Sequence, residues 1–410
     1  KIPVIDIEDI RKDVKPLSNV ESELGGVKVL WHQYFTNKIA YVKLAFDMSH
    51  VPMNLVPYAS FLAEILTIVD TTNYSYQELG NEISIETGGI GATMDVMPTD
   101  VHEFLPMFIL KTKCFYSNIT KAFELLKEVA FESKLDDKKR LKEIIGQIYT
   151  NLKITLTETG HKSAANRAMS YFSEYAAYRE AIQGITMFDT VKKWYENFEE
   201  EYDNIVNGLK KAAKAIFEKQ NMTISYTGKE EAPEFMKAEV ESFIEGLYED
   251  QKQGEKVKVI CTKNNEGFAT AGGVQYVACA GNFKYTGALK VLQMIFSYEY
   301  LWIQLRVKGG AYGCMCSFSD QGDSMFVTYR DPNLAESYKV YDEAADYVAN
   351  FDADDRDMKK YIIGTIGNMD IPMEAVDMGA RSFHAYFLGK TEADLQKDRD
   401  QVLSCTQADI

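Results

Sequence analysis

Histidine is scarce in this sequence, and the scarcity limits the metal chemistry that the chain can support. The five histidines are His32, His50, His102, His161 and His384, and the closest two, His32 and His50, are 18 positions apart. A zinc-peptidase helix needs two histidines four positions apart, with a glutamate that acts as the base. No local motif of that kind is present, which leaves only a site assembled from three distant histidines.

Cysteines are few and irregularly spaced, at Cys114, Cys261, Cys279, Cys314, Cys316 and Cys405. This spacing is unlike a disulfide scaffold and favours a reducing compartment. We therefore expect the protein in the cytoplasm, or in an organelle matrix if its source is eukaryotic. The C-x-C pair at 314 and 316 would place both thiols on one face of a strand. Two buried thiols are the simpler interpretation than a metal site.

Long apolar runs are missing as well. No run reaches the length of a membrane span, and no signal peptide opens the chain, so we expect no membrane partner. The sequence begins at Lys1 and stops at Ile410 in the middle of a pattern. These two observations predict that both ends are cuts in a longer polypeptide.

Basic residues are outnumbered by acidic ones. The chain has 45 Lys and Arg against 61 Asp and Glu, a net charge of −16. Binding to nucleic acid needs clustered basic side chains, so nucleic acid is excluded as a partner. An acidic surface would attract basic peptides, although a surface of this kind also serves simply to keep a protein soluble.

Apolar residues make up 46% of the chain, enough for packed cores in two or three domains. Alternating apolar residues predict strands at 27–31, 41–48, 92–96, 104–115 and 222–227, with a turn at Asn37 and Lys38. Helical periodicity predicts helices at 58–69, 75–87, 118–132, 136–173 and 190–219. Ser75 and Glu78 have the spacing of a capping box at the start of the second of these helices.

A weak internal repeat follows the charged stretch that begins at residue 229. The sequence V-K-V-L-W in the first unit returns as V-K-V-I-C in the second. The second unit has predicted strands at 257–262, 273–278, 312–319 and 324–330. Its predicted helices are at 287–305, 334–351, 354–367 and 372–387.

These elements predict an α+β fold with two tandem homologous units, each a mainly antiparallel sheet with helices packed on one face. The first unit also contains a long helical segment. We divide the chain into a connector (residues 1–18), a first domain (19–232), a linker (233–255) and a second domain (256–410).

The most informative stretch is L-R-V-K-G-G-A-Y-G, residues 305–313. It places Arg306 and Tyr312 on either side of a Lys-Gly-Gly turn that follows a predicted helix. An arginine offers a fixed fork of donors, and a tyrosine hydroxyl can donate to a developing oxyanion. A plainer alternative is an arginine that closes its own helix and a tyrosine that is half-buried on a strand. The turn leaves a helix and lacks the G-x-x-x-x-G-K pattern, so it is not a phosphate loop.

This motif resembles the Arg/Tyr motif in the C-terminal half of the pitrilysin/insulysin family of inverted-zincin metallopeptidases, and in particular its presequence-protease branch. The resemblance extends to most of the chain, through the tandem α+β units and the long helical middle. In this family two homologous halves close around a peptide. The N-terminal half binds zinc through an H-x-x-E-H helix and a distal glutamate, and the C-terminal half keeps the fold without the metal.

The resemblance implies that Arg306 holds the substrate backbone and that Tyr312 stabilises the tetrahedral intermediate. Gly309 and Gly310 would lie against the substrate. Residues 61–65, F-L-A-E-I, fall where the zinc helix of the first unit would be. Only Glu64 survives there, and we interpret it as structural.

The resemblance therefore predicts the non-metal-binding C-terminal half of a zinc endopeptidase that degrades unfolded peptides, and the acidic surface favours basic ones. The zinc cofactor and its ligands would belong to the N-terminal catalytic half of the same polypeptide, and this chain alone would be inactive. The alternative is a non-catalytic peptide-binding or assembly subunit paired with an active homologous chain.

Overall fold

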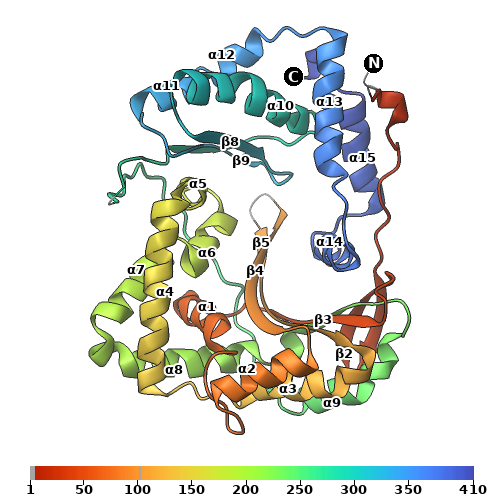
Figure 1. Cartoon of the computed structure of the whole chain (residues 1–410), viewed down its shortest axis with the longest axis vertical. Coiled ribbons are helices and arrows are strands. Elements are labelled where there is room, and N and C mark those ends of the chain that lie inside the picture. The colour runs from red at the N-terminus through yellow and green to blue at the C-terminus, as the bar shows by residue number, and fades with distance from the viewer. Residues whose placement is uncertain (1–4, 101–102, 271) are drawn as a thin grey trace.

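The computed structural model describes residues 5–100, 103–270 and 272–410, so His102 and the first four residues of the predicted connector lie outside the described residues. The two β-sheets lie in opposite halves of the molecule, each with helices on its outer side, and further helices lie between them (Figure 1). Within the described ranges, no helix has the length and apolar character of a membrane span.

The first sheet has six strands in the order β1-β2-β6-β3-β5-β4. Their bounds are β1 Val20–Leu24, β2 Val27–His32, β3 Ile39–Asp47, β4 Ile90–Asp100, β5 Glu103–Phe115 and β6 Met222–Thr227. Asn37 and Lys38 have positive φ angles, as a tight turn requires. However, β2 and β3 are not neighbours, because β6 pairs with both of them, parallel to β2 and antiparallel to β3.

The first part of the chain forms nine α-helices among the described residues. They are α1 Val56–Ile65, α2 Tyr76–Glu86, α3 Ile119–Phe131, α4 Lys138–Glu158, α5 Gly160–Met169, α6 Glu174–Gln183, α7 Ile185–Glu196, α8 Phe198–Ile216 and α9 Lys237–Ile244. The capping box at Ser75 is confirmed, since the Ser75 side chain accepts from the Glu78 backbone and the Glu78 side chain from that of Ser75. The continuous helices predicted at 136–173 and 190–219 are instead broken near Thr159, Ser170 and Asn197.

Helix α9 lies inside the segment that the sequence predicted as a linker. Its Val240 and Phe243 are fully buried in the core of the first sheet. The stretch without helix or strand comes later, at residues 249–270. Charge and one proline made this segment look like a connector, but two apolar residues three positions apart are enough to anchor a short helix.

The strand predicted at 257–262 is wrong. This segment is extended but joins neither sheet, and the Val257 amide donates to the Ser49 carbonyl. Val257 and Val259 pack beside α6, whereas the side chain of Ile260 is 89% exposed. The alternating apolar residues at 257–262 therefore reflect an extended segment that is buried on one side only. The predicted strand at 273–278 likewise begins only at Ala278.

The second sheet is antiparallel and has three strands in the order β7-β9-β8. The strands are β7 Ala278–Asn282, β8 Gly313–Phe318 and β9 Asp323–Tyr329. Helix α10 (Ala288–Ile295) continues into two π-helical segments, η6 (Phe296–Tyr300) and η7 (Trp302–Lys308). The remaining helices are α11 Ala335–Asp342, α12 Ala344–Ala349, α13 Asp355–Met369, α14 Ala375–Phe387 and α15 Glu392–Leu403.

Each sheet is also covered on its second face by a helix from the other part of the chain. Helix α14 packs on the first sheet, where Phe383 is fully buried against Leu30 and Ile109. Helix α5 packs on the second sheet, where the ring of His161 meets the edge of Tyr329 at a centroid distance of 4.9 Å. The predicted α+β fold is confirmed, and the exchanged helices join its two parts.

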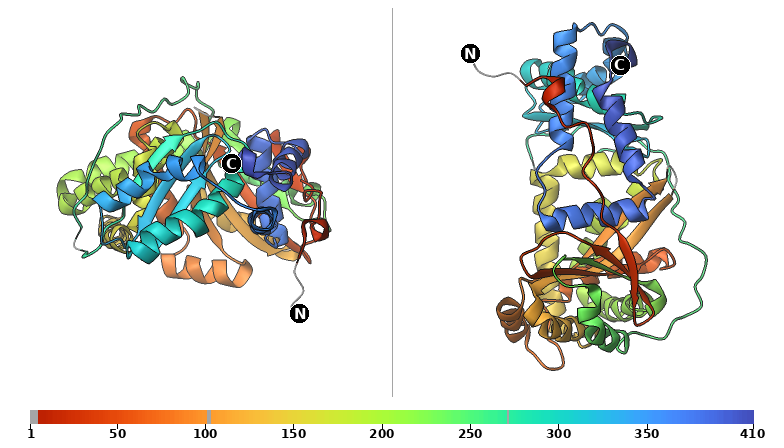
Figure 2. Two further views of the ribbon diagram at one scale, coloured as in Figure 1. Left: turned by 90° about the horizontal axis from the view of Figure 1, so that it is seen from above. Right: turned by 90° about the vertical axis from the view of Figure 1, so that its right-hand side faces the viewer.

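The N-terminal segment runs along the last helices of the chain (Figure 2). The amides of Val14 and Leu17 donate to Gln396 and Glu392 of α15, and the amide of Ser18 donates to Ser382 of α14. Residues 14–18 are therefore held by two of the last helices of the chain.

Candidate functional site

The Lys-Gly-Gly turn forms where η7 ends. The Gly310 amide donates to the Arg306 carbonyl at 3.0 Å, and the Ala311 amide donates to the Leu305 carbonyl at 2.9 Å. Gly310 has a φ of 81°, a conformation in which a side chain is strained. A Cβ at Gly309 would lie 2.6 Å from the Leu305 carbonyl oxygen. Both glycines are therefore needed to bring Tyr312 back beside Arg306.

The Arg306 guanidinium lies between two aromatic rings. Its central carbon is 4.4 Å from the centroid of Trp302 and 5.2 Å from that of Tyr312. One guanidinium nitrogen donates to the backbone carbonyl of Tyr312. The plainer alternative, in which the arginine caps its own helix, is not what the side chain does, because its hydrogen bond goes to the residue after the turn.

The Tyr312 phenol faces solvent, and its side chain is 64% exposed. Its backbone amide donates to the Arg330 carbonyl at 3.2 Å, and its ring meets the edge of Tyr329 at 5.8 Å. Across the ranges that the structure describes, no protein group hydrogen-bonds the Tyr312 hydroxyl. The ring is fixed by its neighbours while the hydroxyl faces solvent, so the hydroxyl can donate a hydrogen bond to a ligand. The structure thus brings Arg306 and Tyr312 together, as the sequence predicted.

Sequence reasoning missed the aromatic residues that support this pair. Trp302 precedes Arg306 by four positions on the same helix, a spacing that signals a possible contact. Tyr329 is the last residue of β9, and His161, whose ring contacts it, belongs to α5. No local pattern connects these last two residues to the motif.

The thiols of the C-x-C pair lie in apolar surroundings. Burial raises the pKa of Cys314 to about 11 and that of Cys316 to about 12, so without a metal both are thiols near neutral pH. The Cys316 thiol lies 3.5 Å from the Gln293 carbonyl, an acceptor within its own unit. Within residues 5–100, 103–270 and 272–410, no three His, Cys, Asp or Glu side chains are grouped as a metal site would require.

The segment at the position of the zinc helix is part of the core. Phe61, Leu62 and Ile65 of α1 are at most 1% exposed and pack against the first sheet. Glu64 lies on the exposed side of the same helix.

Two family models match the chain. The model of the domain associated with peptidase M16, subfamily C, matches residues 1–194, and the PreP C-terminal domain matches residues 232–410. Protein HypA of Clostridium perfringens is 38% identical over 98% of this chain and 42% of its own length. Presequence protease 1, chloroplastic/mitochondrial, of Arabidopsis thaliana is 26% identical over 100% of this chain and 39% of its own length. The chain thus spans about two fifths of the length of these relatives.

Solved structures agree on the fold. The inactive domain of a peptidase M16 from Pseudomonas fluorescens superimposes with a TM-score of 0.63 at 14% identity, covering 96% of this chain and 93% of that one. The ferredoxin protease FusC, solved with Arabidopsis ferredoxin, gives 0.56 at 14% identity, covering 96% of this chain and 46% of that one. With two family models that together cover most of its length, the chain belongs to the peptidase M16 family and corresponds to the C-terminal part of a presequence-protease-like member.

Proposed function

We propose that this chain is the half of a zinc endopeptidase that holds the peptide without binding the metal. The full protein would degrade unfolded peptides enclosed between this part and an N-terminal catalytic half. The described residues offer no cluster that fits zinc, so the ion would be bound outside this chain. This part would contribute binding and charge stabilisation only.

The observation that carries the proposal is the open Tyr312 hydroxyl beside the Arg306 cation. A hydroxyl that donates to the scissile carbonyl oxygen stabilises the negative charge that develops there. The guanidinium has further donors besides the one that bonds to the Tyr312 carbonyl, and these could hold a neighbouring carbonyl of the peptide. Gly309 and Gly310 add no side chains of their own, so the backbone of the turn can approach a ligand closely.

A polypeptide ligand is supported by two further facts. The chain has a net charge of −16, which would draw in basic peptides. A protein with the same fold, the ferredoxin protease, was solved with a protein bound to it. For compartment, the scattered cysteines support the cytoplasm or an organelle matrix.

Replacement of Tyr312 by Phe in the full-length protein tests this role. Loss of one oxyanion donor should lower turnover of an unfolded peptide by roughly 100- to 1,000-fold with little change in KM. Tyr298→Phe is the matched control, because Tyr298 is 63% exposed on the same helical arm and should keep full activity. Equal turnover in the Tyr312→Phe protein and the wild type would remove Tyr312 from the mechanism.

A second candidate is a non-catalytic peptide-binding or assembly subunit, which the inactive M16 domain among the structural neighbours favours. The mass of the native polypeptide distinguishes the two. A single polypeptide of about twice this mass, with bound zinc, supports the endopeptidase. A natural polypeptide that begins near Lys1 supports the subunit.

A further inference from the structure

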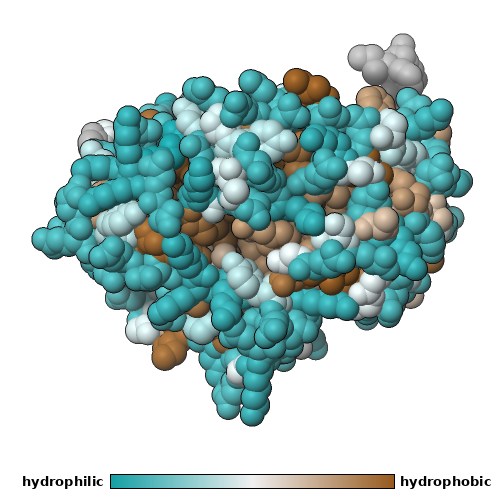
Figure 3. Space-filling view, turned by 90° about the horizontal axis from the view of Figure 1, so that it is seen from below, coloured by the Kyte–Doolittle hydropathy of each residue, from teal (hydrophilic) through white to brown (hydrophobic). Residues whose placement is uncertain are grey.

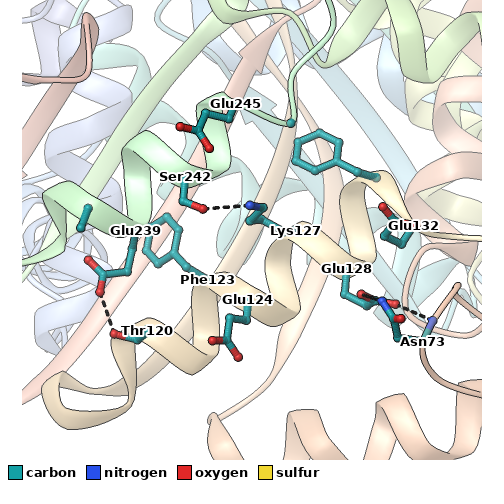
Figure 4. A pocket seen from close by; sticks show the side chains of 13 residues that line it. Asn73, Thr120, Phe123, Glu124, Lys127, Glu128, Glu132, Glu239, Ser242 and Glu245 are labelled. Carbon is teal, nitrogen blue, oxygen red and sulfur yellow. Dashed lines mark hydrogen bonds between the residues drawn. The ribbon is translucent and has the colours of Figure 1, made fainter.

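Helices α3 and α9 lie side by side and point the same way (Figure 4). Near their starts, the Thr120 hydroxyl donates to Glu239 at 2.6 Å. Further along, the Lys127 ammonium donates to Ser242 at 2.8 Å. The C-terminal end of α3 touches that of α9 through Phe131, whose ring is 4.9 Å from that of Phe243. The two helices therefore end at the same end of the pair.

A groove runs between these helices on the helical side of the first sheet, with a volume of about 750 Å³. Its apolar lining comes from Phe123, Phe131 and Ala238. On this side of the molecule, hydrophobic residues lie in a hollow that hydrophilic residues surround (Figure 3). The ionisable residues that line the groove are five acids and one base: Glu124, Glu128, Glu132, Glu239, Glu245 and Lys127. Five negative charges against one positive charge leave the groove with a net charge of −4.

Three of these carboxylates occupy positions that disfavour negative charge. Glu132 caps the C-terminus of α3, and Glu245 caps that of α9. The C-terminal end of a helix is the negative end of its dipole, so a carboxylate there is destabilised. Because α3 and α9 end side by side, the negative potentials of their two C-termini add together. Glu128 is only 8% exposed, in the last turn of α3.

These three charges lack cationic partners. The Glu128 carboxylate accepts from the amide and side-chain nitrogens of Asn73, at 3.1 and 2.9 Å, and both donors are neutral. In the part of the chain that the structure describes, no ion pair joins Glu128, Glu132 or Glu245 to a lysine or arginine. The buried Glu128 is satisfied by Asn73, whereas Glu132 and Glu245 are exposed. Two open carboxylates at the negative ends of two helices favour a cation from outside the described residues.

A metal ion is not that cation, because the carboxylates of the described residues are not gathered into a metal-binding group. They are spread along two helices, with aromatic rings between them. We propose that the groove between α3 and α9 binds a short amphipathic segment of a peptide or protein, rich in Lys and Arg. Its cations meet Glu132, Glu245 and the acids beside them, and its apolar face covers the partly exposed Phe131 and the exposed Ala238. A helix laid in a groove of this kind is a common mode of peptide recognition.

The test is a titration of the 410-residue chain with a fluorescent amphipathic peptide that carries Lys and Arg on one face and Leu on the other. Wild-type chain should bind it with an affinity that falls as salt is added. Glu132→Gln combined with Glu245→Gln should weaken binding about tenfold, through loss of two partly exposed ion pairs. Glu23→Gln combined with Glu336→Gln removes the same net charge from exposed positions elsewhere and should leave the affinity unchanged.

Weaker binding by the groove variant would not be explained by unfolding. The groove variant removes a charge from each of two helix C-termini, so its melting temperature should equal or exceed that of the wild type. Absence of peptide binding, or equal binding by the groove variant and the wild type, overturns the proposal. Binding that Arg306→Ala weakens, but the groove variant does not, would overturn it in favour of the Arg306 site. The role of Tyr312 is tested by turnover of the Tyr312→Phe protein, and the groove is tested by peptide binding. Either proposal can therefore fail while the other stands.

Discussion

The Arg306 guanidinium stacks on Trp302, with 4.4 Å between its central carbon and the ring centroid. The two residues are four positions apart in η7, whose wider winding still places them on adjacent turns. The indole face attracts the cation and limits where it can swing. Arg306 is thus held from one side by Trp302 and from the other by Tyr312.

Removal of the indole should therefore loosen Arg306. In the full-length protein, Trp302→Ala should lower kcat/KM by roughly two- to fivefold, the factor expected for an exposed cation–π contact. Trp302→Phe should recover most of the loss, because a phenyl ring still offers a face. The measurement is steady-state hydrolysis of an unfolded peptide, with the neighbouring Ile303→Ala as control. Equal rates in the Trp302→Ala protein and the wild type would show that the stacking does not position Arg306.

His32 should make the stability of the protein depend on pH. It is fully buried, and its Nδ1 lies 2.8 Å from the Ser18 carbonyl while its Nε2 lies 3.0 Å from the Ser225 hydroxyl. A carbonyl only accepts, so Nδ1 carries the proton and Nε2 accepts from Ser225. Burial lowers the pKa of His32 to about 4, and the neutral ring is the form that fits.

Because the unfolded chain takes up this proton near pH 6.5, the contribution of His32 is complete above that pH. It is lost progressively as the pH falls toward 4, by roughly 3 kcal/mol in all. Urea unfolding between pH 7.5 and about 4.5 measures it. A His32→Asn variant should be less stable at neutral pH but should lose less stability on acidification, and His50→Gln serves as the control. Parallel pH profiles for the His32→Asn protein and the wild type would contradict this assignment.

The close approach of α14 to the first sheet depends on Gly379. A Cβ at this position would collide with the side chain of Thr227 in β6, which is 3% exposed and cannot move into solvent. Gly379→Ala should therefore cost about 1–3 kcal/mol of unfolding free energy. Gly367→Ala in α13 is the matched control, because no atom would lie within 4 Å of its Cβ.

The control should stabilise the protein by about 0.5–1 kcal/mol, since alanine is the better helix former. Thermal unfolding of both variants gives the comparison. A Gly379→Ala protein as stable as the Gly367→Ala protein would mean that α14 can shift away from β6 without loss.

Features set by neighbours in the sequence were predictable. The spacing of Ser75 and Glu78 predicted the start of a helix. The paired glycines at 309 and 310 predicted the turn between Arg306 and Tyr312. In both cases the interacting groups lie within a few residues of each other. Their geometry follows from backbone preferences that each residue type carries with it.

Pairings between distant segments were not predictable in the same way. Nothing near β2 indicates that β6, almost two hundred residues later, separates it from β3. The sequence predicted a helix at 372–387, but nothing in it showed that Phe383 of this helix would pack against the first sheet. The alternation at 257–262 showed that one side would be covered, without showing that α6 and its neighbours would cover it. A periodic sequence pattern indicates which face of a segment is buried, but it does not indicate which other segment covers that face.

The helix exchange described above has a mechanical consequence. With α14 seated on one sheet and α5 on the other, the two sheets cannot separate or rotate without exposing Phe383 and breaking the edge-to-face contact of His161 with Tyr329. The exchanged helices therefore couple the two sheets to each other. Arg306 and Tyr312, which adjoin the second sheet, are thereby tied in position to the first sheet as well.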